Sequence, residues 1–509
     1  MNLHASNPLS AGSDPERARR IFKWTFAVTL LLKIWLAAYF PMTGDEVYFY
    51  QWGVYPDWGY YDHPPMVGWM LYVLNGISSH PLSLRIATVL LWSLVALGMV
   101  DLMRRMAPDR QATAHWLGTF FLALPFTWAL NVVTTDTPLI LFVFASGYCF
   151  IRAGPSGRRP WYVASGIFLG LALLSKYFAG LLAIAYFGYL ARSRHGWLNL
   201  ALIAGCALPF AALNVVYNAT HCWNNVMFNL LNRHENSQWS LGTVATYVGM
   251  MIYLITPWVL LKLVRSRRLM RVRGALVVLF LVPFALFLLL SARKTIGLHW
   301  VLGFMPFVFL FVATVSSADE MRKYFRWTVW FSVPHFAVLA AIILLPISVW
   351  EGTRLYDDIV FHKENKAIVA ALRNGLPQGG ALMARAYTPA SLLSYHAGEY
   401  WPVFGEGRYH ARQDDIIVDF REYARRSIRL FDRNPIRVAD LNPFFESVST
   451  GSFKIDSVKY WYADGKKFNY PVYRERILKT IAERYYRIPS FLPVYGCQFL
   501  QRYDFSGGR

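Results

Sequence analysis

The sequence predicts a polytopic α-helical membrane protein that ends in a smaller extracytoplasmic α/β domain. Hydrophobic residues make up 55% of the 509 residues, aromatic residues make up 17%, and the mean hydropathy is +0.30. The apolar residues are concentrated in long runs before Trp350, and a mixed, charged, Tyr-rich segment follows to Arg509. This composition excludes an ordinary soluble globular protein and is typical of a membrane-embedded helical bundle.

About eleven apolar runs are expected to form the spans, and runs of about 14 residues are also compatible with re-entrant segments. The expected spans are Ile21–Phe40, Leu82–Met103, Trp116–Leu130, Thr137–Ile151, Trp161–Leu174, Phe178–Ala191, Trp197–Tyr217, Val244–Val264, Ala275–Ala292, His299–Val315 and Trp327–Val349.

Basic residues orient these spans. If odd-numbered spans run outward, the short outer connections hold only Lys176, Arg233, Arg293 and Lys294, whereas the inner ends are rich in Arg. Cytoplasmic connections of membrane proteins carry such an excess. We therefore expect a cytoplasmic amino terminus and an outer segment 350–509. The net charge of +21 then reflects the membrane topology. The basic residues are scattered over many connections and do not form one face, which argues against a nucleic-acid partner.

The expected domains are a cytoplasmic tail (1–20), a transmembrane domain (21–349) containing a first outer loop (41–80), and an outer α/β domain (350–509). Within the last, helices are expected over Asn365–Asn374 and Tyr473–Tyr485, and strands over Ala381–Ala386 and Asp415–Phe420.

Four cysteines are present. Cys149 and Cys206 lie within expected spans and are interpreted as packing residues. Cys222 and Cys497 are both expected outside, but without geometry a disulfide between them is not predicted.

The first outer loop contains the adjacent acids Asp45 and Glu46, directly after the first span. Carboxylates at the edge of a bilayer are costly to desolvate, which favours a functional role. A carboxylate aimed at a bound ligand can serve as a general base. The loop is also rich in Tyr and Trp, including Tyr61. These rings could stack on a sugar or prenyl chain, or form an interfacial aromatic belt.

Other polar residues are expected on the same side. Asp136 starts the fourth span, where it could cap the helix as well as serve a site. Lys176 could bind a phosphate or extend from a span end to the interface. His63 could be a turn residue. The pair Arg293-Lys294 could bind phosphate or be an exception to the charge rule.

Three motifs together resemble a known family: the acid pair, Tyr60-Tyr61-Asp62-His63-Pro64-Pro65, and Thr134-Thr135-Asp136-Thr137-Pro138, followed by Ser175-Lys176-Tyr177. They resemble the polyprenyl-phosphate-sugar glycosyltransferases of the C-type fold. The bacterial branch includes lipid A aminoarabinose transferase and rhizobial galacturonosyltransferases, and protein O-mannosyltransferases are more distant relatives. The resemblance covers roughly residues 20–310, and Arg385–Tyr400 is similar to a segment of the family's outer domain.

The resemblance implies transfer of a sugar, with inversion, from a polyprenyl-phosphate carrier to a lipid or glycan acceptor outside a bacterial inner membrane. By position, Asp45 (with Glu46 beside it) matches the catalytic acid and Asp136 the second acid. Tyr61, His63, Lys176, Arg293 and Lys294 are the candidate donor-binding residues. Aminoarabinose transferases have Lys where this chain has His63, which puts the aminoarabinose substrate in doubt.

No cofactor is certain from the sequence. A divalent metal ion held by Asp62 and His234 is one hypothesis, although two ligands fall short of a metal site. No nucleotide-binding Gly motif is present.

Two other functions stay open at this point. One is a transferase that acts on protein hydroxyls or moves a whole oligosaccharide. The other is a polyisoprenoid-lipid transporter, which would need charges along a path through the midplane. Here the charges gather at the outer edge instead.

Overall fold

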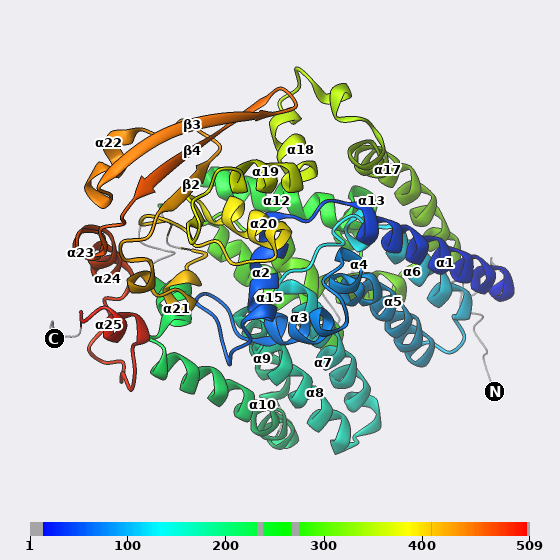
Figure 1. Ribbon diagram of the computed structural model, residues 1–509. Helices are drawn as coiled ribbons and strands as arrows, with labels where there is room; N and C mark the ends of the chain where they lie inside the picture. The colour runs from blue at the N-terminus through cyan, green and yellow to red at the C-terminus, as the bar shows by residue number, and fades with distance from the viewer. Residues whose placement is uncertain (1–13, 193, 232–237, 267–273, 409, 506–509) are drawn as a thin grey trace, which may run out of the picture. The chain divides into compact units, whose positions relative to one another are not determined.

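The computed structural model describes residues 14–192, 194–231, 238–266, 274–408 and 410–505 (Figure 1). The chain separates into two compact units. Unit 1 is formed by Met1–Phe40, Ser78–Ala212 and Ser237–Ala341, and unit 2 by Pro41–Ile77, Leu213–Asn236 and Ile342–Arg509.

Long apolar helices carry most of the membrane character. Among the described residues, five segments are long and apolar enough to cross a membrane by length and composition. They are α1 (Pro15–Tyr39), α4 with α5 (Pro81–Leu84 and Ile86–Met106), α7 (Asp136–Ser156), α10 (Arg194–Thr220) and α17 (Ala318–Leu344). A multi-pass membrane protein is therefore confirmed, while the count of about eleven spans stays a prediction.

Shorter helices coincide with the remaining expected spans. They are α6 (Gln111–Ala123), α8 (Arg159–Leu173), α9 (Gly180–Leu190), α12 (Leu241–Ile255), α13 (Pro257–Arg265), α15 (Ala275–Ser291) and α16 (Met305–Thr314). The span expected over Val244–Val264 is interrupted, because α12 and α13 meet at an angle of 97°. Thr256, between them, has φ of 69°, and Pro257 has no N–H to continue the helical ladder.

The core of unit 1 is built around α16. Residues Met305–Ala313 of this helix are all buried, and α6 is buried along its whole length. Phe309 packs edge-on against Phe120 with ring centroids 5.4 Å apart. A helix that is apolar on every side is stable only when neighbours surround it, which accounts for the central place of α16 in this unit.

Unit 2 contains a four-stranded sheet in the order β1-β2-β4-β3. β1 (Ala381–Ala384) runs parallel to β2 (Ile428–Asp432), with Ala381 opposite Ile428. β3 (Ser447–Ile455) and β4 (Val458–Lys466) form an antiparallel hairpin, and β4 pairs with β2. The helices of this unit's carboxyl-terminal part are α18 (Tyr356–Lys363), α19 (Asn365–Arg373), α20 (Tyr387–Ala397), α21 (Asp414–Ile417), α22 (Val438–Leu441), α23 (Tyr470–Tyr473), α24 (Lys479–Tyr485) and α25 (Gln498–Arg502).

Most of the local predictions for this segment agree with these elements. The helix expected over Asn365–Asn374 is α19, and the strand expected from Ala381 is β1. Tyr473–Tyr485 is helical through α23, a π-helical turn (Arg474–Leu478) and α24. The strand expected over Asp415–Phe420 is wrong. Asp415 lies in the first turn of α21, where a carboxylate favours a helix, and Arg412 binds its side chain.

The segment expected to be a loop (41–80) is also helical. It forms α2 (Gly44–Val54) and α3 (Met66–Ile77), and α2 packs against α3 and α20. A disulfide joins Cys222 to Cys497 within unit 2, a pairing that the sequence did not favour but left open. The two residues are 275 positions apart, and only the fold brings them together.

Candidate active site

Glu46 has a structural role at the start of α2. Thr43 is the N-cap residue, and its side chain accepts a hydrogen bond from the backbone N–H of Glu46. In return, Glu46 Oε2 accepts from the N–H and the hydroxyl of Thr43, each at 3.1 Å. This reciprocal capping box satisfies donors that the first turn of a helix leaves unpaired. The buried Glu46 carboxylate is thereby committed to the fold, which leaves its predicted catalytic role without support.

Asp45, one position earlier, is exposed. The hydroxyl of Tyr387, at the start of α20, donates a hydrogen bond to Asp45 Oδ1 at 3.1 Å. Burial, followed by the Asp45 charge, raises the pKa of Tyr387 to about 12, so this hydroxyl keeps its proton and remains a donor. The contact orients one carboxylate oxygen of Asp45. The exposed carboxylate can accept a proton from an incoming hydroxyl group.

The segment Tyr61–His63 lies in the same unit. Tyr61 is buried, its backbone N–H donates to Gln413 Oε1 at 2.9 Å, and its ring packs against Phe228. These are packing contacts, so a role of Tyr61 in donor binding stays a prediction that its surroundings do not support. Asp62 Oδ1 lies 3.3 Å from His63 Nδ1, and Asp62 is buried. The imidazole ring of His63 therefore lies next to an acidic side chain.

A second acid of unit 2, Asp414, lies close to these groups. Its carboxylate accepts hydrogen bonds from the Tyr400 hydroxyl and, at 2.6 Å, from the backbone N–H of Val403. Burial raises the pKa of Asp414 to about 6, despite these bonds. The charge of Asp414 also contributes, after burial and Asp62, to raising the pKa of Tyr48. No sequence motif marked Asp414, because the two groups that donate hydrogen bonds to it lie 11 and 14 positions away.

In unit 1, Asp136 and Lys176 form a buried ion pair. Lys176 Nζ donates to the two carboxylate oxygens of Asp136 at 3.0 and 2.8 Å. Their side chains are only 4% and 9% exposed. His299 Nε2 lies 3.9 Å from the same carboxylate. Asp136 is also the first residue of α7, so its expected place at a helix start is confirmed. The pair neutralises Lys176, and a phosphate would have to compete with Asp136 for it.

Arg293 and Lys294 follow the carboxyl end of α15. Arg293 is exposed and its guanidinium carbon lies 5.5 Å from the centre of the Trp239 ring. Lys294 Nζ lies 6.0 Å from the Trp300 ring centre. Both cations are placed against aromatic faces, which is a favourable arrangement for a cation. Their predicted role as phosphate ligands stays a prediction.

The metal hypothesis has no geometric support in the described part of the chain. His234 lies outside the described residues, and no group of three or more His, Cys, Asp or Glu side chains suited to a metal occurs among those that are described. The ion-pair contact of Asp62 is with the ring of His63, 3.3 Å away.

Sequence reasoning missed several buried cations, including Lys33 within an expected span. Lys33, in the middle of α1, is fully buried and its Nζ donates to Ser93 Oγ at 2.6 Å. Asn131 Nδ2 donates to the Lys33 carbonyl at 2.8 Å. A Lys within an apolar run is itself a signal of function or of a polar contact between helices, and this one could have been noticed. Tyr387 was also missed as an individual residue, although its segment was part of the resemblance.

Comparisons with known proteins agree with this architecture. The family described as dolichyl-phosphate-mannose-protein mannosyltransferase matches residues 62–218. Two solved structures of ArnT from Cupriavidus metallidurans, one in the apo state and one bound to undecaprenyl phosphate, cover 87% of this chain and 97% of theirs. Their TM-score is 0.61 at 16% sequence identity. The chain has the C-type glycosyltransferase fold.

The C-type fold inferred from the motifs is therefore confirmed. The lipid A galacturonosyltransferase RgtD of Rhizobium johnstonii is 25% identical over 245 residues, which are 44% of this chain and 50% of RgtD. The chain thus spans about half the length of this curated relative. The family match includes Asp62, His63, Asp136 and Lys176 but begins after Asp45.

Proposed function

We propose that this chain is an integral-membrane glycosyltransferase that moves a sugar from a polyprenyl-phosphate carrier to a lipid A or related cell-envelope acceptor, with inversion. The observation that carries this proposal is the exposed Asp45 carboxylate, oriented by Tyr387 in a chain of C-type fold. The names of ArnT and RgtD support the carrier and the acceptor class, because one ArnT structure holds undecaprenyl phosphate and RgtD acts on lipid A.

In the proposed reaction, Asp45 accepts the proton of the acceptor hydroxyl as the acceptor oxygen attacks the anomeric carbon. The new bond joins that carbon to the acceptor oxygen. The bond between the anomeric carbon and the phosphate oxygen breaks, and polyprenyl phosphate leaves as an anion. Cations stabilise such a leaving group. His63, Arg293 and Lys294 are the proposed ligands of this phosphate, and Asp136 is proposed as the second acid of the site.

The proposed topology places the amino terminus in the cytoplasm and residues 350–509 outside the bacterial inner membrane, with the transmembrane domain over 21–349. The uneven distribution of Arg and Lys supports it. The Cys222–Cys497 bond supports it independently, because disulfides persist in oxidising compartments such as the periplasm.

The decisive test is Asp45→Asn, with transfer assayed from a radiolabelled polyprenyl-phosphate sugar to lipid A. A general base contributes about 10²- to 10⁴-fold to a rate. We expect kcat to fall by about that factor, while expression and donor binding are retained.

Asp440→Asn is the matched control, because Asp440 is a partly exposed acid of unit 2 that pairs with Arg437. It should transfer at the parental rate. If Asp45→Asn retains near-normal turnover, Asp45 is not the base. Loss of transfer in the control as well would point to a general defect of the unit.

A further inference from the structure

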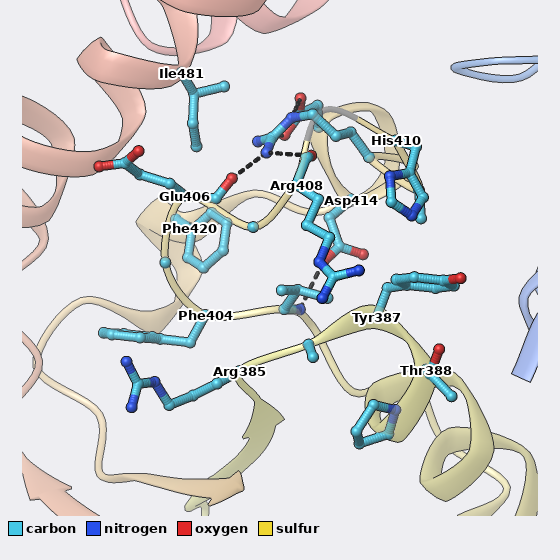
Figure 2. Close-up of a pocket in the computed structure, with 18 of the residues that line it drawn as sticks. Arg385, Tyr387, Thr388, Phe404, Glu406, Arg408, His410, Asp414, Phe420 and Ile481 are labelled. Carbon is cyan, nitrogen blue, oxygen red and sulfur yellow. Dashed lines mark hydrogen bonds and ion pairs between the residues drawn. The ribbon is translucent and has the colours of Figure 1, made fainter. Parts of the chain in front are cut away.

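Unit 2 contains a cavity of about 610 Å³ to which the proposed reaction so far assigns no ligand (Figure 2). It lies between the start of α20 and the segments Val403–Arg408 and His410–Asp415. Its volume is within the range of about 300–1,000 Å³ typical of small-ligand sites. A headgroup of one or two sugar rings is therefore a suitable occupant by size.

Four arginines line this cavity, and three of them are committed to acids. Arg412 is buried and binds both oxygens of Asp415, each at 2.7 Å. Arg433 binds Asp358 at 2.7 Å, and Arg385 makes a longer contact of 3.7 Å with Asp432. The guanidinium of the fourth, Arg408, has neither an acidic partner nor a hydrogen-bond partner among the described residues. Its charge is thus available to a ligand.

Arg408 extends into the cavity toward Tyr387 (Figure 2). Its charge opposes the rise in the pKa of Tyr387 that burial and Asp45 cause, so the two side chains are electrostatic neighbours. The ring of His410 stands edge-on to that of Tyr387, with centroids 5.3 Å apart. The hydroxyl of the same tyrosine donates to Asp45. The cavity wall therefore includes the residue that orients the proposed base.

We propose that this cavity is a subsite for an anionic group, a carboxylate or a phosphate, carried by one of the two sugars of the reaction. Arg408 is its principal ligand. The planar guanidinium matches both oxyanions through two parallel hydrogen bonds. This inference rests on the proposed function, and it makes the enzyme selective for charged substrates.

Two sources can supply this group: a uronic acid on the donor, or a phosphate on the acceptor. Both place an oxyanion on a sugar that takes part in the proposed reaction. The ring of Tyr387 provides a flat apolar surface beside the cation, as sugar-binding sites require. Glu406 lines the opposite part of the cavity, where its Oε2 lies 4.0 Å from Arg484, and it disfavours a second anion there.

The test is Arg408→Gln, assayed with four substrate pairs. The donors are polyprenyl-phosphate galacturonic acid and polyprenyl-phosphate galactose. The acceptors are lipid A with its phosphates and the same lipid A after dephosphorylation. We expect the variant to raise KM at least tenfold for the charged form of one substrate and to leave the KM of its neutral counterpart unchanged. The substrate affected identifies the source of the anion.

Arg437→Gln is the matched control, since Arg437 is an exposed arginine of the same unit that pairs with Asp440 outside the cavity. It should behave as the parent with every substrate. Arg408→Lys keeps the charge but loses the two parallel N–H donors of the guanidinium, so it should give an intermediate KM. Such partial activity would show that the effect of Arg408→Gln is not caused by misfolding. Equal KM values for parent and Arg408→Gln with all four pairs would overturn the subsite.

Binding measured without turnover separates this inference from the proposed function. Calorimetry of the purified protein with galacturonic acid and with glucosamine 1-phosphate should show binding of one of them to the parent and at least tenfold weaker binding to Arg408→Gln. If this difference is found but no polyprenyl-phosphate sugar is transferred, the subsite stands and the proposed function falls. If transfer occurs and neither ligand distinguishes the two proteins, the subsite falls and the function stands.

Discussion

Asp45 and Glu46 are neighbours in the chain but differ in what their carboxylates do. Successive residues of a helix point about 100° apart, so one of two adjacent acids can face inward while the other faces solvent. Glu46 closes the capping box with Thr43, whereas Asp45 is exposed and meets Tyr387. Their adjacency predicted a site at the end of the first span, but it could not divide the two roles.

The buried pair Asp136–Lys176 raises the question of whether Lys176 serves the fold or the donor. We expect Lys176→Met to lower the free energy of unfolding by about 3–5 kcal/mol, because Asp136 would be left as a buried, unpaired charge. The double variant Asp136→Asn with Lys176→Met should recover most of this loss. Thermal unfolding in detergent, analysed as a double-mutant cycle, measures the coupling.

A different result is expected if Lys176 mainly binds the donor phosphate. In that case Lys176→Met would unfold like the parent and would bind polyprenyl phosphate more weakly. Thr243→Val, a change at another helix start of unit 1, serves as a control for general sensitivity of the unit to loss of one polar contact.

At the scale of elements, α2 shows a signal that the sequence reading did not use. Thr43-Gly44-Asp45-Glu46 has the Thr-x-x-Glu spacing of a capping box, which predicts a helix start. The many Tyr and Trp residues of the segment were instead interpreted as surfaces for ligand stacking or as an interfacial belt. The bend between α12 and α13 was likewise marked by Pro257, since Pro disfavours a continuous helix through its position.

Gly44 allows α2 to approach α20 closely. A Cβ at this position would lie 2.4 Å from Thr388 Cγ2, so Gly44→Ala must push the two helices apart. Displacement of about 1 Å near reacting groups can cost about 100-fold in rate. We expect Gly44→Ala to reduce kcat about 10- to 100-fold by breaking the Asp45–Tyr387 contact, measured in the transfer assay.

Thr388→Ser removes the clashing methyl group and should restore much of the activity of Gly44→Ala. Gly76→Ala is the control, because nothing lies within 4 Å of the Cβ it would add on α3. Full activity of Gly44→Ala alone would show that the spacing of α2 and α20 does not set the position of Asp45.

For the whole molecule, the cysteines report the compartment of unit 2. Cys222 and Cys497 are bonded, while Cys149 and Cys206 are free. We expect the protein, denatured under alkylating conditions, to take up two maleimide–polyethylene glycol groups before reduction and four after it, as counted by gel shift. Expression in a strain without periplasmic disulfide oxidation should yield four in both samples. Four groups before reduction in the ordinary strain would contradict an outer location of this bond.

The sequence by itself determined the membrane class and, through its motifs, the C-type fold. These features depend on hydropathy, charge and short motifs, which are properties of neighbouring residues. The tertiary structure alone decided which side chains meet: Lys176 with Asp136 across 40 positions, Cys222 with Cys497 across 275, and Asp45 with Tyr387 across 342. Such contacts depend on how helices pack, and packing combines distant segments whose partners no local pattern specifies. The tertiary structure also decided which arginines of the cavity are paired. Arg385, Arg412 and Arg433 each contact an acid, whereas Arg408 has no acidic partner among the described residues.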